Sequence, residues 1–99
     1  MKKILLMCMG GFSTGLLVEK MKEAARNSNE EVEITAIGST SLDEVVKDYD
    51  ILLLAPQINY IAAEVEKKYP DLPVYLIQPT DYGRLKGDKI LAKSLEMIR

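Results

Sequence analysis

The chemically most capable stretch of the chain is a short loop near its N-terminus that contains the only cysteine. Cys8 directly follows an apolar run at residues 4–7, and a segment rich in glycine and hydroxyl groups separates it from a helical pattern beginning near Leu16. Backbone N–H groups at a helix N-terminus lack intrahelical partners, and the helix dipole favours negative charge there. The same field favours a thiolate over a thiol. The pattern therefore predicts a cysteine nucleophile that handles a phosphate.

The segment after the cysteine is expected to cradle that phosphate with its backbone. Glycine allows a ligand to approach the backbone closely, and this segment has more glycines than a turn needs. Two hydroxyl residues, Ser13 and Thr14, are expected to be helix N-caps, a role compatible with anion contact. Two apolar residues, Met9 and Phe12, either pack locally or form a rim for a docking protein, and we favour the rim. The expected phosphate loop consists of Met9, Gly10, Gly11, Phe12, Ser13, Thr14 and Gly15.

The same loop lacks a positive charge, which distinguishes between two kinds of cysteine chemistry. Phosphatases that attack through cysteine stabilise the transition state with a guanidinium forked onto the phosphate. No arginine or lysine lies between Cys8 and Gly15. Backbone N–H groups and hydroxyls alone can hold a phosphocysteine without strongly promoting its hydrolysis. This favours a phosphate carrier over a phosphatase. The alternative, that Cys8 is only a small buried apolar residue, is weakened by its position at a strand end beside glycines.

Length and composition limit what the rest of the chain can be. Its 99 residues fit one domain, residues 1–99, and 47% of them are hydrophobic, enough for a core. A single cysteine excludes an intrachain disulfide, and with no histidine we expect no metal site and no cofactor. A net charge of −2 with scattered cations argues against nucleic acid as a partner. No apolar stretch is long enough for a membrane span, so we expect a soluble protein. The single free thiol favours a reducing, cytoplasmic setting, and we expect a monomer.

Strand and helix patterns alternate along the chain. Continuous apolar runs predict central strands at residues 3–7 and 51–54, and polar–apolar alternation predicts an edge strand at 32–36. A fourth strand is expected at 74–77. Helical spacing follows each strand: from about residue 16 to 26, after a Ser41/Glu44 capping box, from 58 to 68, and from 91 to 98. The segment 81–83 is expected to cap and turn before the last helix.

This alternation predicts an α/β fold, an open four-stranded parallel sheet with helices on both faces. Placing the continuous runs at the centre gives the strand order 2-1-3-4. Such sheets bind ligands at the carboxyl ends of the strands where the order reverses, here between strands one and three. The loops that meet there are 8–15 and 55–58, so Pro56 and Gln57 are expected beside Cys8. The topology thus points to Cys8 independently of its chemistry.

Three ordered motifs make the chain resemble a known family. They are Cys8-x-x-Gly11-x-Ser13-Thr14, the run A-P-Q-I-x-Y at 55–60, and D-Y-G at 81–83. The chain resembles, over essentially its full length, the enzyme IIB component of the lactose/cellobiose (chitobiose) class of the phosphoenolpyruvate-dependent sugar phosphotransferase system. It departs from the usual loop at Phe12 and Gly15, and has Ala55 where glycine is usual. The resemblance implies a fold similar to low-molecular-weight tyrosine phosphatases.

The resemblance also implies a mechanism and partners. Cys8 would accept phosphate from a phosphohistidine of the IIA component, hold it as phosphocysteine and pass it to a β-linked sugar. That sugar, of the cellobiose, chitobiose or lactose type, would be held by the membrane component IIC, with which the protein would associate peripherally. Both partners must reach the same sulfur, so docking is expected around Met9, Phe12 and the 56–60 loop. Roles for Tyr60, Asp81 and Tyr82 are left open.

Other functions remain open at this point. A low-molecular-weight tyrosine phosphatase or an arsenate reductase would share the thiol loop, and Asp81 could then be a general acid, but Thr14 stands where arginine is needed. A flavin-binding module is a further alternative, opposed by an aromatic content of only 6%. A regulatory domain of the same architecture would not use Cys8 at all.

Overall fold

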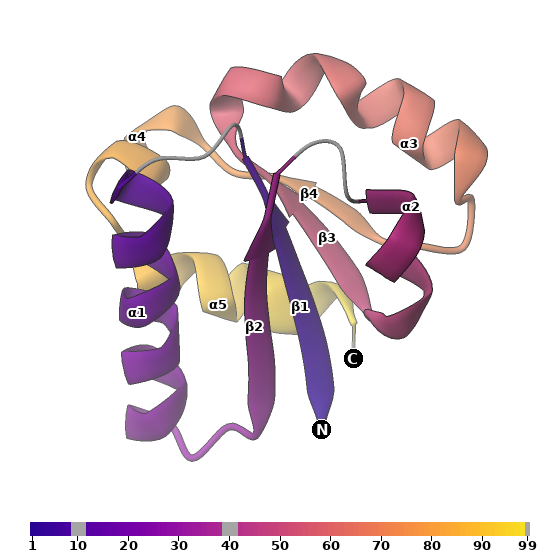
Figure 1. Ribbon diagram of the computed structural model, residues 1–99. Helices are drawn as coiled ribbons and strands as arrows, with labels where there is room; N and C mark the ends of the chain where they lie inside the picture. Colours follow the sequence, from indigo (N-terminus) through magenta and orange to yellow (C-terminus); the bar gives the residue numbers. More distant parts are fainter. Residues whose placement is uncertain (9–11, 39–41, 99) are drawn as a thin grey trace.

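A four-stranded parallel sheet forms the centre of the molecule (Figure 1). The structure is a computed structural model that describes residues 1–8, 12–38 and 42–98, and only the backbone of residues 12–14. The strands lie in the order β2-β1-β3-β4, and each pairs with its neighbours in parallel. The predicted fold class and strand order are confirmed. The strands are β1 (Lys2–Met7), β2 (Val32–Ile37), β3 (Ile51–Leu54) and β4 (Val74–Leu76).

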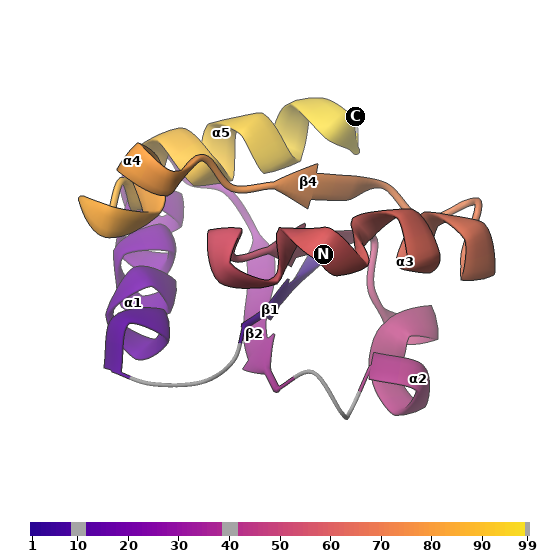
Figure 2. The same cartoon turned by 90° about the horizontal axis from the view of Figure 1, so that it is seen from above.

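Helices cover both faces of this sheet. Figures 1 and 2 show α1 and α5 on one face and α2 and α3 on the other, as parallel strands with helical crossovers require. Among the helices that the structure describes, none is both long and apolar enough to cross a lipid bilayer. The helices are α1 (Phe12–Asn27), α2 (Leu42–Val45) continued by the 3-10 turn η2 (Val46–Asp48), the 3-10 segment η3 (Pro56–Ile61), α3 (Ala62–Lys68), α4 (Pro79–Gly83) and α5 (Gly87–Met97).

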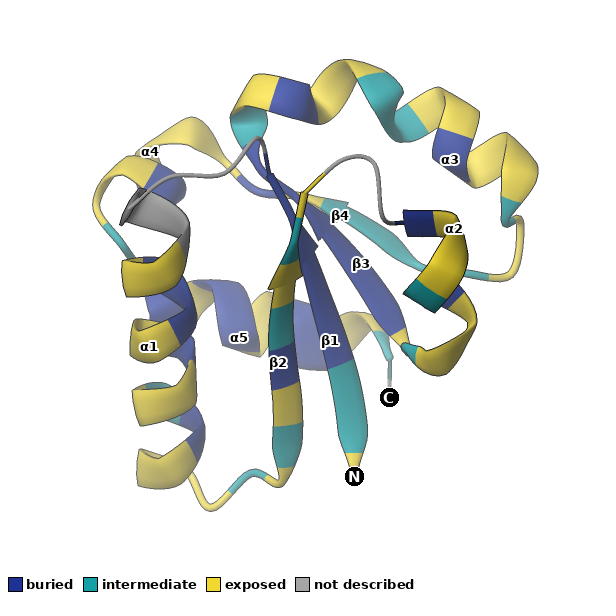
Figure 3. Cartoon of the chain, viewed as in Figure 1, coloured by how far each residue is buried: buried dark blue, intermediate teal, exposed yellow. Residues whose placement is uncertain are grey.

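The two middle strands form the core. Every residue of Ile51–Leu54 and of the run 4–7 is 0% exposed, and the dark centre of Figure 3 marks these strands. Full burial of one such side chain stabilises the fold by about 1.5–3 kcal/mol. On β2 only Ile34 is buried, because that strand lies at the edge of the sheet. The sequence pattern predicted both the central pair and this edge.

The first helix begins earlier than the sequence pattern predicted. It starts at Phe12 instead of near Leu16, so Ser13 and Thr14 lie within its first turn and are not N-caps. The prediction followed the apolar spacing, which begins only at Leu17. The first N–H groups of a helix still lack intrahelical partners, so this correction leaves an anion site possible.

Four further boundaries differ from the prediction, and one of them is the start of α5, at Gly87 instead of residue 91. Residues 79–83 form the short helix α4, because Pro79 is well suited to a helix start, and not only a turn. The helix expected from residue 58 is a 3-10 segment up to Ile61 and an α-helix only from Ala62, and the 3-10 segment is itself kinked at Ile58, which has non-helical angles (φ −120°, ψ 21°). Strand β4 ends at Leu76, although the Ile77 N–H still donates to the Leu54 carbonyl at 3.0 Å. Of the predicted capping box, Glu44 lies in α2 and Ser41 lies outside the described residues.

Candidate active site

Cys8 lies at the carboxyl end of the central strand β1, where the strand order reverses. Its backbone N–H donates to the Ile37 carbonyl at 3.2 Å, which extends the pairing with β2 by one residue. On the other side the Ala55 N–H donates to the Met7 carbonyl at 3.1 Å. Cys8 is thereby held between the ends of two neighbouring strands, and it is 3% exposed. This is the position that the topology predicted for it.

The N-terminus of α1 follows the cysteine at the same edge of the sheet (Figure 1). The N–H groups of its first turn and the helix dipole together favour an anion there. Of the predicted phosphate loop, Met9, Gly10 and Gly11 lie outside the described residues, as do the side chains of Phe12, Ser13 and Thr14. Gly15 is exposed, and a Cβ built on it would meet nothing within 4 Å, so no described packing contact requires glycine at this position.

The second predicted loop lies at the same edge. It follows β3, the neighbour of β1, and begins with the buried residue Ala55. Pro56 is half-buried and opens η3, and Gln57 is exposed. Since β1 and β3 are parallel and paired at Met7 and Leu54, both loops leave the sheet side by side. The topology therefore correctly predicted that Pro56 and Gln57 occupy the edge that carries Cys8.

Two large apolar side chains are exposed on the elements of this edge. Leu16, in α1, is 54% exposed, and Tyr60, in η3, is 74% exposed. Exposed apolar groups beside a polar loop are typical of surfaces that bind other proteins. The sequence analysis included Tyr60 in its docking loop but missed Leu16. The sequence did hold a signal for the exposure of Leu16. Leu16 directly precedes Leu17 of the buried stripe, and neighbouring residues of a helix point in different directions, so Leu16 faces away from the core.

A buried carboxylate lies on α4, which follows the end of β4. Asp81 is 5% exposed, and its Oδ1 lies 3.3 Å from the Nζ of Lys89 in α5. Among the described residues, its Oδ2 has no hydrogen-bond partner. Burial, and then the negative charge of Asp81, raise the pKa of Tyr75 on β4. The sequence analysis expected only a cap and turn here, since nothing in the motif at 81–83 predicted that its carboxylate would be buried.

A polar cluster connects α2 and α3, which lie on the opposite face of the sheet from α1 and α5. Asp43 in α2 accepts hydrogen bonds from Lys68 Nζ at 2.9 Å and from the Tyr69 hydroxyl. The Lys68 ammonium and then the Tyr69 hydroxyl lower the pKa of Asp43, and the bond to Asp43 raises the pKa of both partners. These three residues and Met7 help to line a hollow of about 290 Å³ next to Tyr60. Through Met7 this hollow reaches the residue of β1 that precedes Cys8.

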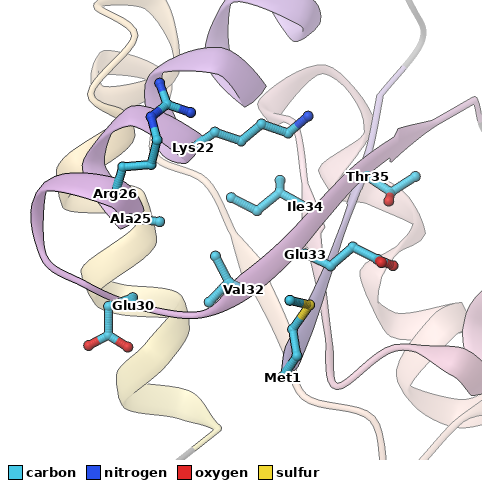
Figure 4. Close-up of a pocket in the computed structure, with 9 residues that line it drawn as sticks. All are labelled: Met1, Lys22, Ala25, Arg26, Glu30, Val32, Glu33, Ile34 and Thr35. Atoms are coloured by element: carbon cyan, nitrogen blue, oxygen red, sulfur yellow. The ribbon is translucent and has the colours of Figure 1, made fainter.

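The largest described hollow lies elsewhere. It occupies about 670 Å³ between α1 and β2, and Figure 4 shows the side chains that line it. Met1 and Val32 contribute to it, and both belong to the amino-terminal end of the paired strands. Cys8 follows the opposite, carboxyl end. The largest hollow therefore does not coincide with the site that the cysteine and the topology predict.

Comparison with known proteins shows which proteins this chain resembles. The family model described as "PTS system, Lactose/Cellobiose specific IIB subunit" matches residues 3–93. The chain is 38% identical to the oligo-beta-mannoside-specific EIIB component of Bacillus subtilis, over 99% of this chain and 97% of that protein. It is also 34% identical to the lactose-specific EIICB component of Staphylococcus epidermidis. That alignment covers 97% of this chain but only 16% of the longer relative.

Two solved structures have the same fold. The cellobiose-specific IIB component of Borrelia burgdorferi superimposes with a TM-score of 0.82 and is 35% identical, covering 98% of this chain and 91% of that one. The lactose-specific IIB domain of Streptococcus pneumoniae gives a TM-score of 0.85 at 22% identity, covering 99% of this chain and 98% of that one. The second likeness concerns the fold alone, and it extends over the whole sheet and its helices.

Proposed function

Because the chain belongs to the lactose/cellobiose-specific IIB family of the sugar phosphotransferase system, we propose that Cys8 carries a phosphoryl group as S-phosphocysteine. The Cys8 thiolate attacks the phosphorus of a phosphohistidine on the IIA component. The S–P bond forms as the P–N bond breaks, and the imidazole of IIA leaves with the electron pair and takes up a proton. The observation that carries this proposal is the position of Cys8 at the end of β1, next to the N-terminus of α1.

The second step passes the phosphoryl group to a sugar on the membrane component IIC. A sugar hydroxyl attacks the phosphorus, the S–P bond breaks, and the Cys8 thiolate is restored as the hydroxyl proton is lost. The names of the relatives, oligo-beta-mannoside-specific and cellobiose-specific, support a β-linked sugar as the acceptor. The EIICB relatives join C and B components in one protein, which supports IIC as the partner. The protein would then work at the cytoplasmic side of the membrane, as a monomer.

Positioning and charge stabilisation account for most of such a transfer. Backbone amides of the loop from Met9 to Gly15, with the hydroxyls of Ser13 and Thr14, would hold the phosphoryl oxygens. This loop contains no lysine or arginine. Without a guanidinium to stabilise attack by water, the phosphocysteine would survive until a sugar arrives.

Both partners must reach the same sulfur, so their docking surfaces overlap. The exposed side chains of Leu16 and Tyr60 on the elements around Cys8 would contact IIA and IIC in turn. Met9 and Phe12 of the loop and the Pro56–Gln57 turn would complete this surface. Since each contact must end before the next begins, a small and short-lived interface is expected.

Intact-mass analysis tests the proposal. The protein is incubated with phosphoenolpyruvate, the general phosphotransferase proteins and a panel of IIA components, beside a Cys8→Ser variant. One added phosphoryl group on the wild type and none on the variant is the expected result. Failure to gain mass with every IIA, or equal gain by the variant, contradicts it. Hydrolysis of an aryl phosphate by the wild type alone would indicate a phosphatase instead.

A further inference from the structure

The hollow between α1 and β2 has an apolar floor and a charged rim. Figure 4 shows the side chains of Val32 and Ile34 pointing toward α1, with Lys22 and Arg26 of that helix beside them. Both cations are exposed, one helical turn apart. We call this hollow, together with the outer edge of β2, the β2 groove. The hollow lies toward the amino-terminal end of the strands, whereas the edge of β2 runs on to Ile37, whose carbonyl accepts from the Cys8 N–H.

The outer edge of β2 presents unpaired backbone groups. The carbonyls of Glu31 and Ile37 accept hydrogen bonds from β1, at 3.3 and 3.2 Å. In a parallel strand the backbone groups of alternate residues point the same way. The N–H and C=O groups of Val32, Ile34 and Ala36 therefore point away from β1. No strand lies beyond β2 in the described sheet, so these groups are available to another chain.

The opposite edge of the sheet is built differently. Proteins protect free edges with short strands, prolines and charged side chains. The edge strand β4 has only three residues and follows Pro73. Strand β2 has six residues, contains no proline, and carries one charge, that of Glu33. Of the two edges, β2 is the one on which a further strand can pair.

The charges along the groove determine what can bind. Neither Lys22 nor Arg26 has an ion pair with a described residue, whereas Glu33, which also lines the hollow but from the other face of the strand, lies 3.9 Å from Lys3 Nζ. Glu30, near the end of the groove, already has a partner. The unpaired positive charge thus lies on the α1 side of β2. A strand paired with β2 would direct every second side chain to that side.

We propose that the β2 groove binds an extended acidic segment of a partner protein, which adds to the sheet as a fifth strand. Alternate acidic side chains of that segment pair with Lys22 and Arg26. The side chains between them in the segment are neutral, because they lie on the face of β2 that carries the negative charge of Glu33. Main-chain hydrogen bonds provide affinity and the alternating side chains provide specificity. Because the segment pairs with the edge of β2 that faces away from β1 and Cys8, it stays bound while the cysteine is used. The proposal is independent of phosphoryl transfer.

NMR titration of the ¹⁵N-labelled protein tests the proposal. The probe is a capped octapeptide of alternating glutamate and threonine, and the control peptide has lysine in place of glutamate. The acidic peptide should shift and protect from exchange the outward amides of Val32, Ile34 and Ala36, and the basic peptide should not. No shift at β2, equal binding of the basic peptide, or shifts centred on Cys8 would overturn it. Protection that rises with protein concentration alone would assign the edge to a second copy and also overturn it.

Matched variants separate charge from backbone pairing. Lys22→Glu with Arg26→Glu should weaken binding at least about tenfold, while Lys47→Glu with Lys67→Glu, an equal change at exposed sites elsewhere, should not. Ala36→Pro removes an outward N–H and leaves the pairing with β1 intact, so it should abolish binding in a folded protein. Thermal unfolding and the NMR spectrum check that each variant folds. Unchanged affinity in the charge-reversal variant or in a folded Ala36→Pro variant contradicts the proposal.

Discussion

The interior of the sheet and its carboxyl edge differ in both residue type and burial. Over residues 4–7 of β1 and 51–54 of β3, the interior consists of leucine, isoleucine and methionine side chains that are 0% exposed. At the edge, a cysteine is followed by a polar, glycine-rich loop, and Leu16 and Tyr60 are exposed nearby. A side chain sealed in the interior contributes to stability but cannot meet a partner protein. Stability and function are therefore expected to respond to different substitutions, and each prediction below tests that separation.

A substitution in the interior of the sheet is expected to change the free energy of unfolding most. Leu53→Ala removes a fully buried side chain from β3 and should lower the free energy of unfolding by about 2–5 kcal/mol, because a cavity remains in a packed core. Urea unfolding measures it. Leu76→Ala on β4, where the side chain is 40% exposed, is the control and should cost far less. Equal losses would mean that β3 is not the core strand described here.

The contact between α1 and α5 gives the next largest effect. A Cβ on Gly87 would lie 2.6 Å from backbone atoms of Lys20 and Met21, so Gly87→Ala forces the helices apart. We expect a loss of about 1–3 kcal/mol, as for other overpacked sites. Gly83→Ala provides the control, since its Cβ would meet nothing within 4 Å. Thermal unfolding of the two variants should differ by several degrees, and identical midpoints would contradict the close packing.

The edge should respond in the opposite way. Leu16→Ser with Tyr60→Ala removes exposed apolar groups, so stability should change little while transfer from IIA slows by about tenfold. Phosphorylation rates at increasing IIA concentrations measure this, and the loss should appear as weaker binding. Met97→Ser, at a side chain 42% exposed on α5, is the control. A double variant that transfers at the wild-type rate would remove these two residues from the docking surface.

The cluster between α2 and α3 should give the smallest effect. Hydrogen bonds from Lys68 and Tyr69 lower the pKa of Asp43 below its usual 3.8, so the ionised form favours the folded state. The stabilisation is complete above that value and is lost as pH falls through the lowered pKa. Asp43→Asn should therefore be slightly less stable than the wild type at neutral pH, with the difference vanishing in acid. A difference independent of pH, or one shared by Asp48→Asn, would contradict this.

Sequence reasoning succeeded where a single physical rule governs. Continuous apolar runs predicted the buried strands β1 and β3, alternation predicted the edge strand β2, and helical crossovers predicted the parallel order. From these alone Cys8 could be placed at the carboxyl edge beside Pro56 and Gln57. The rule that ligands bind where strand order reverses predicted the candidate site at this edge without any knowledge of side-chain contacts.

It failed where tertiary contacts override local pattern. The start of α1 was placed too late because its first turn, from Phe12, has no apolar stripe. The burial of Asp81 depends on how its own helix, α4, packs beside α5, and the turn-like motif at 81–83 gives no information about that packing. The positive charge beside the β2 edge was also missed, since whether Lys22 and Arg26 have ion-pair partners depends on neighbours distant in sequence. Local patterns determine which elements form, whereas these features depend on how the elements meet.

The most direct measurement is ³¹P NMR of the phosphorylated protein, before and after addition of membranes that contain a matching IIC and its sugar. The account predicts one resonance of sulfur-bound phosphorus, absent from Cys8→Ser. That resonance should persist until the sugar is added and then be replaced by the signal of a sugar phosphate ester. Phosphorus bound to oxygen or nitrogen of the protein, or decay to inorganic phosphate without sugar, would contradict the role of Cys8 as a phosphate carrier.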